Sequence, residues 1–318
     1  VFREWFESTL PHANENVSRG RCYTRRKEAE NLARVEAAVQ SLLITVCRCG
    51  IELKTPAVEM HMLRLRLLTF NIAHGRGLTP IQGFTSSRKL RANLRKIGHL
   101  INKHEPDVVA LQEIDQNSRW AGNFDHLEYL KLHTGYQHSI FGINNRRGGL
   151  INLSYGNAFL SRYPIIEAEN IVFGTRTVGE KGFLYVELDV GGIRVPVLNL
   201  HLHYRSRVHR FRQIERIMDY VADKHQHRSD HWYMPPIVCG DLNNSAHLPD
   251  ATAELLRYFS LHGDYSLHPL GGLTFPSPLP SRGLDFVFLP PACHEVKCEV
   301  VRSFLSDHRP VLVDFALK

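Results

Sequence analysis

The sequence has little that would place it in a membrane or in a disulfide-bonded scaffold. Its longest apolar runs, such as residues 42–47, are far shorter than the about 20 residues that a bilayer-spanning helix needs. We therefore predict no transmembrane segment. The six cysteines form no CxxC pair and show no disulfide-framework spacing, so we expect reduced thiols and a cytoplasmic protein. Internal repeats and low-complexity tracts are absent as well.

Basic residues are in excess. The 318 residues carry 39 Lys and Arg against 32 Asp and Glu, which is a formal charge of +7, and 19 histidines besides. Residues 63–318 alone hold 30 Lys and Arg and 24 Asp and Glu. This balance favours an anionic partner, such as nucleic acid, a phosphorylated metabolite or a lipid head group, and does not choose among them.

The chain divides by sequence pattern into two parts. Residues 1–61 are typical of a helical N-terminal extension, because residues 28–46 place apolar side chains at helical spacing behind a basic run at 25–27. This part carries no catalytic motif. Residues 62–318 are expected to form a larger second domain. The first residue is Val1 rather than Met, which indicates a fragment or a processed chain.

A predicted buried strand ending in polar residues organises the larger part. Residues 237–245 read Ile-Val-Cys-Gly-Asp-Leu-Asn-Asn-Ser, an apolar run that stops at Asp241 and Asn243. If the chain stays extended there, the two side chains share a direction and can act on one phosphoryl oxygen or one water. Taken alone, Asp and Asn at a strand end are more often turn formers.

Further strands with a polar residue at one end recur along the chain. The predicted strands cover residues 63–72, 107–113, 136–141, 156–160, 165–173, 183–190, 194–203, 284–289, 295–302 and 310–315. The polar residues at their ends include Asn71, Glu113, His201, Asp285, Asp307 and His308. Amphipathic helices are predicted at 87–104, at 208–223 with Val208 facing inward, and at 251–259. Carboxylates suit Mg²⁺, amides suit phosphate or water, and imidazoles carry protons, so the set contains the parts of metal-assisted phosphoryl transfer to water.

The same residues lie in motifs that resemble the endonuclease/exonuclease/phosphatase superfamily, the DNase I-like group. The motifs are Thr69-Phe-Asn71-Ile, Leu111-Gln-Glu113-Ile-Asp115, Gly156-Asn157-Ala-Phe-Leu-Ser161, Asn199-Leu-His201-Leu, Gly240-Asp241-Leu-Asn243, Leu284-Asp285-Phe-Val and Ser306-Asp307-His308-Arg-Pro310. The resemblance implies that residues 62–318 form a catalytic domain. It also implies an α/β fold, a four-layer αββα sandwich in which two mixed β-sheets are flanked by helices.

The resemblance implies a metal site as well. Glu113 resembles the principal Mg²⁺ ligand of the superfamily, with Asn71 beside it and Asp307 as a second acidic ligand. Mn²⁺ is the expected substitute ion. Both are hard cations that prefer oxygen ligands.

Five residues would act on the phosphate by the same resemblance. Asp241 would orient or deprotonate the attacking water, and Asn243 would hold a non-bridging oxygen. His308 would pair with Asp285, which would keep the imidazole cationic. His201 would donate to the phosphate or serve as general acid for the leaving oxygen.

Four further residues are candidates for substrate binding, although each has a weaker signal. They are Asn157, Lys181, His203 and Arg205. Alternation places His203 on the side of His201, while Lys181 and Arg205 lie in loops near the expected site. A charged loop residue is more often simply solvated. Neither His74 nor Trp120 has a motif that would assign it to the site.

We expect a Mg²⁺-dependent phosphodiesterase that acts on an anionic phosphate ester, either nucleic acid or a lipid or small-molecule phosphodiester. A phosphomonoesterase and a catalytically silent phosphate-binding module are the alternatives. The stretch 282–286 lacks the Trp-Cys-Asp-Arg pattern of inositol polyphosphate 5-phosphatases, and the His201 motif differs from that of abasic-site endonucleases. Loop 269–283 is a poor match to the hydrophobic hairpin of neutral sphingomyelinases. The chain is therefore most similar to bacterial-type hydrolases of the superfamily, and its natural substrate, metal count and oligomeric state stay open.

Overall fold

The computed structural model describes residues 63–149, 152–174, 180–228 and 234–317. The expected N-terminal extension at residues 1–61, with its helix at 28–46, lies outside these described residues. No helix in the described ranges has both the length and the apolar character needed to cross a membrane.

The described residues form two six-stranded sheets. The first sheet contains β1 (Leu63–Asn71), β2 (Val108–Asp115), β3 (His138–Arg147), β4 (Leu153–Ser161), β11 (Cys293–Val300) and β12 (Val311–Leu317), in the order β11-β12-β1-β2-β4-β3. The second contains β5 (Ile165–Val172), β6 (Gly182–Val190), β7 (Ile193–His201), β8 (Ile237–Asp241), β9 (Ser266–His268) and β10 (Asp285–Leu289), in the order β5-β6-β7-β8-β10-β9. Both sheets are mixed, because β1 runs parallel to β2 and β7 runs parallel to β8 while the other pairs are antiparallel.

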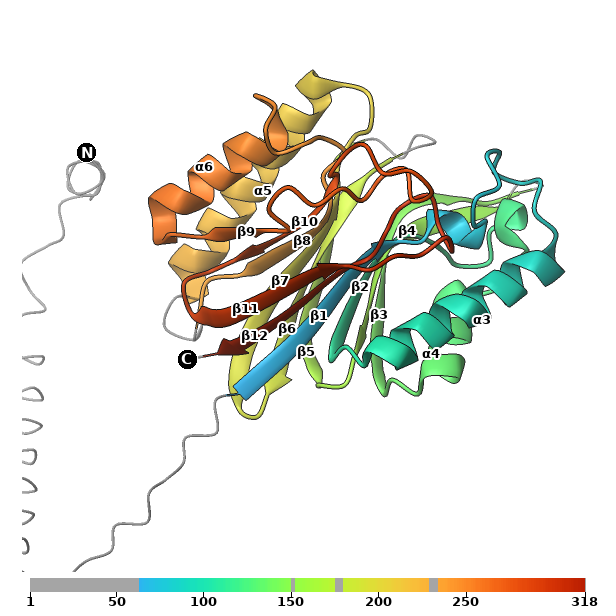
Figure 1. Cartoon of the computed structure of the whole chain (residues 1–318), viewed down its shortest axis with the longest axis horizontal. Helices are drawn as coiled ribbons and strands as arrows, with labels where there is room; N and C mark the ends of the chain where they lie inside the picture. The colour runs from blue at the N-terminus through green and yellow to red at the C-terminus, as the bar shows by residue number, and fades with distance from the viewer. Residues whose placement is uncertain (1–62, 150–151, 175–179, 229–233, 318) are drawn as a thin grey trace, which may run out of the picture. The chain divides into compact units, whose positions relative to one another are not determined.

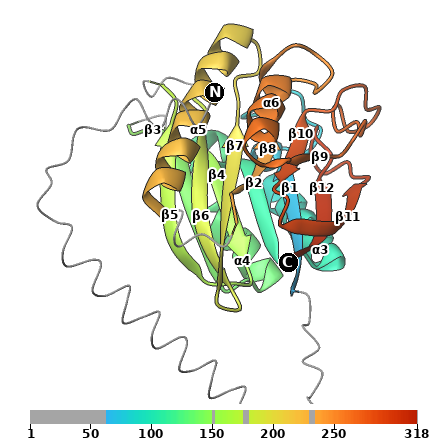
Figure 2. The same ribbon diagram turned by 90° about the vertical axis from the view of Figure 1, so that its left-hand side faces the viewer.

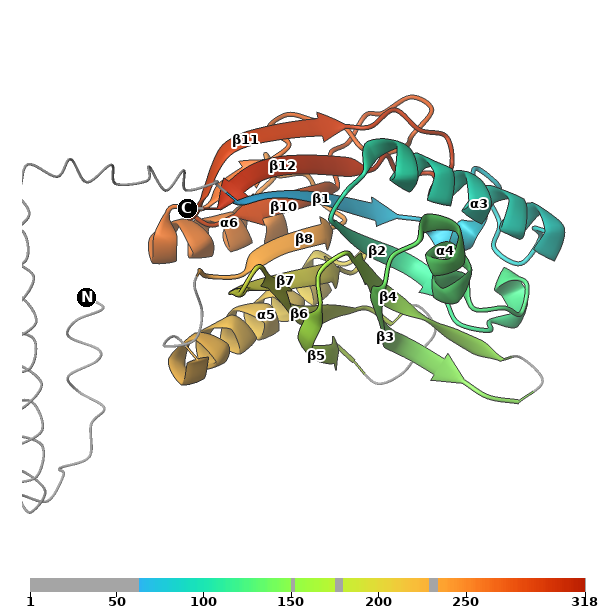
Figure 3. The same ribbon diagram turned by 90° about the horizontal axis from the view of Figure 1, so that it is seen from below.

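In the described part of the chain, four α-helices cover the outer faces of the two sheets, as Figures 1–3 show. The helices α3 (Ser87–His104) and α4 (His126–Thr134) pack on the first sheet, and α5 (Arg207–Arg228) and α6 (Ala251–Gly263) pack on the second. Apolar side chains fill the space between each sheet and its helices, and a third apolar cluster lies between the two sheets and includes Leu65, Phe159, Val186 and Cys239. This arrangement confirms the predicted four-layer αββα sandwich.

The core follows from simple side-chain periodicity. In β1, Leu65 and Leu67 face the layer between the sheets, while Leu68 and Phe70 face the helices. The helix α3 occupies its predicted range and begins after Ser86, whose side chain accepts a hydrogen bond from the Lys89 backbone N–H.

Some elements differ from the prediction. Val208 is 61% exposed and does not face inward, because it lies in the first turn of α5, one turn before Phe211 reaches the apolar layer. The helix α4 and the strand β9 were not predicted. Their apolar signals are short, and α4 depends on the Asp125 carboxylate, which accepts hydrogen bonds from the Leu127 and Glu128 backbone N–H groups.

The strand directions bring polar strand ends to one end of the sandwich. Because β1 and β2 are parallel, Asn71 lies beside Gln112, the residue before Glu113. In the second sheet His201 of β7 is paired with Asp241 of β8, and Asp285 of the antiparallel β10 lies opposite the same Asp241. The fold thus gathers residues that are far apart in sequence.

Candidate active site

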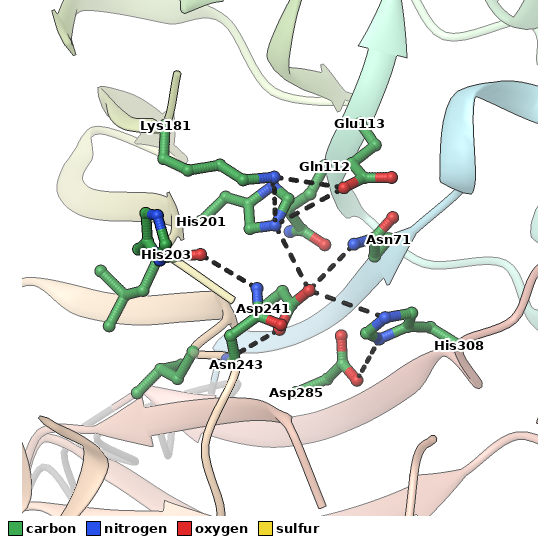
Figure 4. Close-up of polar contacts among 12 residues, drawn as sticks. Asn71, Gln112, Glu113, Lys181, His201, His203, Asp241, Asn243, Asp285 and His308 are labelled. Atoms are coloured by element: carbon green, nitrogen blue, oxygen red, sulfur yellow. Dashed lines mark hydrogen bonds and ion pairs between the residues drawn. The ribbon is translucent and has the colours of Figure 1, made fainter. Parts of the chain in front are cut away.

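A cavity of about 360 Å³ opens at these strand ends. Eight predicted site residues line it, namely Asn71, Glu113, Lys181, His201, Asp241, Asn243, Asp307 and His308. Figure 4 shows that side chains from both sheets point toward one another here. The cavity therefore lies across the junction of the two sheets.

Asp241 is the hub of the polar contacts in Figure 4. Its Oδ2 accepts a hydrogen bond from Asn71 Nδ2 (2.9 Å), and its Oδ1 accepts one from the Asn243 backbone N–H (2.9 Å). The same Oδ2 lies 3.5 Å from His201 Nε2 and 3.7 Å from His308 Nε2. Burial raises the pKa of Asp241 to about 7, against the opposing charge of His308. This carboxyl group can therefore exchange a proton near neutral pH.

The backbone around Asp241 has two unusual residues. A Cβ on Gly240 would lie 1.9 Å from the Leu200 carbonyl oxygen on the neighbouring strand, so this position needs glycine. Asn243 has a φ of +55° in the left-handed region, which Asn tolerates better than most residues. The chain therefore does not stay extended after Asp241, which is the condition under which the two side chains are expected to share a direction. Both side chains nevertheless line the cavity.

His308 and Asp285 form a buried pair on one wall. His308 Nδ1 donates to Asp285 Oδ2 at 2.8 Å, which leaves Nε2 directed toward Asp241 and the cavity. Burial alone would lower the pKa of His308, but the charges of Asp285 and Asp241 outweigh it and raise the pKa to about 10. The imidazole is consequently cationic at neutral pH.

Glu113 reaches the cavity through an irregularity in β2. The pairing of β2 with β4 shifts between Gln112 and Ile114, and Glu113 between them has a φ of +50°. Its side chain is 21% exposed, compared with 1% for Asp241. Glu113 is thus the more accessible of the two carboxylates.

Three nitrogen groups surround the Glu113 carboxylate. Lys181 Nζ donates to Oε1 at 3.2 Å, His201 Nε2 lies 3.7 Å from Oε1, and His74 Nε2 lies 3.5 Å from Oε2. Burial would raise the pKa of Glu113, but Lys181, His74 and His201 together hold it well below its ordinary value. Glu113 is therefore ionised.

Lys181 and His201 form a contact that bears on the proton expected of His201. Lys181 Nζ donates to His201 Nε2 at 2.9 Å. Burial and the Lys181 charge hold the pKa of His201 well below its ordinary value. The imidazole is neutral in this arrangement, and Lys181 carries the proton that faces the cavity.

Three of the predicted substrate-binding residues, Asn157, His203 and Arg205, belong to the described part of the chain but do not line the cavity. Asn157 is fully buried and donates to the carbonyl oxygens of Gly182 and Asn199, so it ties the two sheets together beneath the site. His203 Nδ1 accepts hydrogen bonds from the Arg205 and Ser206 backbone N–H groups. The Arg205 guanidinium lies over the Tyr204 ring, 5.2 Å from its centroid.

Several lining residues have no motif that would have assigned them to the site. They are His74, Arg76, Trp120, Tyr155, Tyr204, Phe275 and Arg282. Arg76 pairs with Asp307, whose Oδ2 lies 2.6 Å from Arg76 Nη2. For His74 and Arg76, sequence position could have indicated the site, because both follow shortly after the strand end at Asn71.

The oxygen atoms around the cavity suit a hard divalent cation. Asp241, Asp285 and His308 have donor atoms within 4.8 Å of one another, but the cationic His308 would have to lose a proton before its Nε2 could bind an ion. Glu113 is partly exposed, and its nitrogen neighbours stand 3.2–3.7 Å away. Glu113 therefore fits a Mg²⁺ ligand better than the buried trio does.

The family of the chain follows from its sequence. The sequence profile described as "Endonuclease/Exonuclease/phosphatase family" matches residues 68–308. The chain belongs to this family. Endonuclease/exonuclease/phosphatase proteins are hydrolases that act on phosphoesters and are generally metal-dependent. The family confirms the resemblance found in the sequence motifs, and the matched residues begin in β1 and end at His308.

Two relatives illustrate the range of the similarity. The chain is 26% identical over 233 residues to the "Probable RNA exonuclease NGL3" of Saccharomyces cerevisiae, in a match that covers 67% of this chain and 44% of the yeast protein. The chain thus spans less than half of that protein. It is 25% identical over 276 residues to the "Uncharacterized protein YbhP" of Escherichia coli, with 81% of this chain and 99% of the relative covered.

Two solved structures share the fold. An endonuclease/exonuclease/phosphatase from Beutenbergia cavernae superposes with a TM-score of 0.59 at 21% identity, covering 80% of this chain and 72% of the other. Sphingomyelinase C from Streptomyces griseocarneus superposes with a TM-score of 0.54 at 22% identity, covering 80% and 99%. Both support the four-layer architecture.

Proposed function

We propose that the protein is a Mg²⁺-dependent phosphodiesterase that cleaves its substrate by direct attack of water. The observation that carries the proposal is the pairing of two kinds of carboxylate in one cavity. Asp241 is buried beside a cationic His308, while the ionised Glu113 is accessible a few ångströms from the Lys181 ammonium. The first arrangement suits proton transfer and the second suits a cation.

Glu113 would hold the ion, with Asn71 and Asp307 as further oxygen donors on the cavity wall. The bound Mg²⁺, or Mn²⁺ in its place, supplies positive charge that stabilises the phosphoryl oxygens as the reaction proceeds. Asn71 already shares its amide between two partners, since Nδ2 donates to Asp241 and Oδ1 accepts from the Ala73 backbone N–H (3.0 Å). It therefore also fixes Asp241 relative to the turn at Ala73.

Asp241 would accept the proton of the attacking water. Its pKa of about 7 allows it to act as a base without leaving it permanently protonated at neutral pH. The hydrogen bonds from Asn71 and from the Asn243 backbone hold both carboxylate oxygens in place. The proton acceptor is thus oriented before substrate binds.

His308 and Asn243 would bind the non-bridging oxygens of the phosphate. The His308 cation contributes charge, and Asp285 keeps its Nε2 pointed into the cavity. The Asn243 amide donates to the Leu202 carbonyl oxygen (2.9 Å), which sets the side-chain orientation and leaves its second N–H available.

Lys181 is the proton donor that the geometry favours for the leaving oxygen. His201 accepts a hydrogen bond from Lys181 and is neutral, so its function here is to position the ammonium rather than to supply the proton itself. The sequence predicts the other assignment, in which His201 is the proton donor and Lys181 a substrate-binding residue. Protonation of the leaving alkoxide completes the displacement.

The substrate class is an anionic phosphodiester. Arg76 and Arg282 line the cavity, and aromatic rings of Trp120 and Phe275 stand near them. This mixture suits a phosphate that carries an organic group on either side. The name of the yeast relative points toward RNA, whereas the Streptomyces structure points toward a lipid phosphodiester, and the cavity residues fit both.

The test is hydrolysis of bis-(p-nitrophenyl) phosphate and of p-nitrophenyl phosphate in Mg²⁺, Mn²⁺ or EDTA. We expect diester turnover that EDTA abolishes and that Glu113→Ala and His308→Ala each lower by at least about 100-fold. Arg257→Ala is the matched control, because this residue is exposed on α6 and pairs with Glu254 outside the cavity.

The two substrates separate the possible outcomes. Preferred hydrolysis of the monoester would replace the proposal by a phosphomonoesterase, and diester turnover that persists in EDTA would refute the metal requirement. A panel of RNA, DNA and phospholipid diesters then identifies the substrate. Affinity for a nucleic acid should fall steeply with salt, because several Lys or Arg contacts displace counterions.

A further inference from the structure

His74 occupies a strained position next to Glu113. It lies in the 3₁₀ turn η1 (Ala73–Gly75) with a φ of +56°, and the preceding Ala73 has a φ of +46°. Two successive non-glycine residues in the left-handed region are energetically unfavourable and persist only where the surroundings enforce them. Asn93 helps to hold this turn, since its Nδ2 donates to the Gly75 carbonyl oxygen at 3.1 Å.

Both ring nitrogens of His74 face a carboxylate. Nδ1 lies 2.6 Å from Asp115 Oδ2, and Nε2 lies 3.5 Å from Glu113 Oε2. Asp115 is itself fully buried, and its other oxygen accepts a hydrogen bond from Trp120 Nε1 (2.8 Å). The contacts therefore run in a chain from Trp120 through Asp115 and His74 to Glu113.

Ring packing alone does not explain these contacts. The His74 ring does pack against Trp120 and Tyr155, at centroid distances of 5.2 Å and 5.4 Å. An apolar side chain could fill that space without making any polar contact. The two ring nitrogens of His74 instead face Asp115 and Glu113, so the imidazole bridges the two carboxyl groups.

The two oxygens of Glu113 have different surroundings. Oε2 faces His74, whose position is fixed by Asp115, whereas Oε1 faces the Lys181 ammonium, which ends a flexible side chain. A partner held by a second buried group orients a ligand more strongly than a flexible one does.

We propose that His74, held by Asp115 and Trp120, is a positioning residue that fixes Glu113 through Oε2 and presents Oε1 to the divalent cation. The inference rests on the proposed role of Glu113 as metal ligand. His74 acts through Glu113, and the expected consequence of its loss is weaker ion binding rather than a lost proton-transfer step.

Two substitutions of His74 separate its two contacts. The amide nitrogen of Gln occupies nearly the place of Nε2, and that of Asn nearly the place of Nδ1. His74→Gln therefore keeps a donor for Glu113 and gives up the contact with Asp115, while His74→Asn does the reverse. The pair differs by one methylene, and both variants remove the imidazole ring, so a general loss of packing would affect them alike.

The readout is Mn²⁺ and Mg²⁺ binding to the metal-free chain of 318 residues, measured by isothermal titration calorimetry without substrate. We expect His74→Asn, which loses the donor to Glu113, to weaken binding by about 10-fold or more, and His74→Gln, which keeps that donor but loses its Asp115 partner, to weaken it by only a few-fold. Trp120→Phe keeps an aromatic ring but removes the donor to Asp115 together with part of the ring surface next to His74, so it should weaken binding by a few-fold. Thermal unfolding without metal checks that each variant is folded.

Glu113→Gln distinguishes the failure of this inference from the failure of the proposed function. If Glu113→Gln weakens ion binding but His74→Asn binds like the parent, the positioning role is refuted and the metal role of Glu113 stands. Equal losses in the Asn and Gln variants would also refute positioning through Oε2. If Glu113→Gln binds the ion like the parent, the metal role itself fails and the inference falls with it.

Discussion

Replacing Asp241 by Asn should stabilise the metal-free protein while abolishing its activity. The Asp241 carboxyl group is buried between the two sheets, and burial raises its pKa from the ordinary 3.8 to about 7. The raised pKa means that the folded protein holds the ionised form at a cost in free energy. Asn resembles the protonated acid in shape and carries no charge, so it avoids this cost.

The magnitude follows from the two pKa values. At about 1.4 kcal/mol for each pKa unit, a rise from 3.8 to about 7 corresponds to about 4 kcal/mol of destabilisation above pH 7. Asn offers one acceptor oxygen in place of two, so the hydrogen bond from Asn71 or from the Asn243 backbone is lost, at about 1–2 kcal/mol. We therefore expect a net gain of about 2–3 kcal/mol in the free energy of unfolding.

The gain should depend on pH with a defined sign. Between pH 3.8 and about 7 the folded state keeps a proton on Asp241 that the unfolded state has released. The destabilising effect of Asp241 therefore grows as the pH rises through this window and is complete above it. The advantage of the Asn variant should grow in the same way.

Urea denaturation in EDTA across the range from pH 5 to pH 8 measures this difference. Asp314→Asn provides a control of opposite sign, because hydrogen bonds from Arg64 and Arg66 outweigh burial and lower the pKa of Asp314. That variant should lose a little stability, since the side chains of Arg64 and Arg66 are 42% and 40% exposed and solvent weakens their attraction to Asp314. An Asp241→Asn protein that is less stable than the parent at pH 8, or whose gain is the same at every pH, would refute the reasoning.

Two further substitutions test the catalytic assignments. Asp285→Asn should lower kcat by about 100- to 1,000-fold, because the His308 cation, with its pKa of about 10, depends on that carboxylate. Part of the activity should return as the pH falls below the reduced pKa of His308, and a kcat–pH profile identical to that of the parent would contradict the pairing. Lys181→Met should bind Mn²⁺ more tightly by calorimetry, because the ammonium 3.2 Å from Glu113 Oε1 competes with the ion, yet it should hydrolyse bis-(p-nitrophenyl) phosphate more slowly. Unchanged or weaker Mn²⁺ binding would show that the two cations do not share this oxygen.

The strands that carry the site could be predicted because their apolar runs are long and end abruptly. In β8 the run of apolar residues stops at Asp241, and in β1 the buried apolar residues Leu65, Leu67 and Phe70 lead directly to Asn71. Local pattern is sufficient for such strands because both faces of each sheet are covered. The motifs then indicated which strand ends belong together.

Alternation failed where the backbone departs from regular geometry. Val109 and Leu111 face the helical layer, so regular alternation would also point Glu113 toward the helices. The bulge after Gln112 turns Glu113 into the cavity instead. At the end of β7 alternation wrongly places a residue in the site. The strand stops at His201, so the His203 side chain no longer shares the direction of the His201 side chain. Neither departure has a signature in the sequence itself.

Three of the nine non-glycine residues with positive φ in the described part of the chain line the cavity. His74, Glu113 and Asn243 all line it, and each has a φ between +50° and +56°. A helix or strand preference would not place these side chains there, and the conformations cost free energy that the buried layers around them must offset. The three residues bring an imidazole, a carboxylate and an amide to the lining of one cavity. Relieving this strain, for example by allowing Glu113 to adopt a regular strand conformation, would move its carboxylate out of the cavity, so the strain is part of how the site is built.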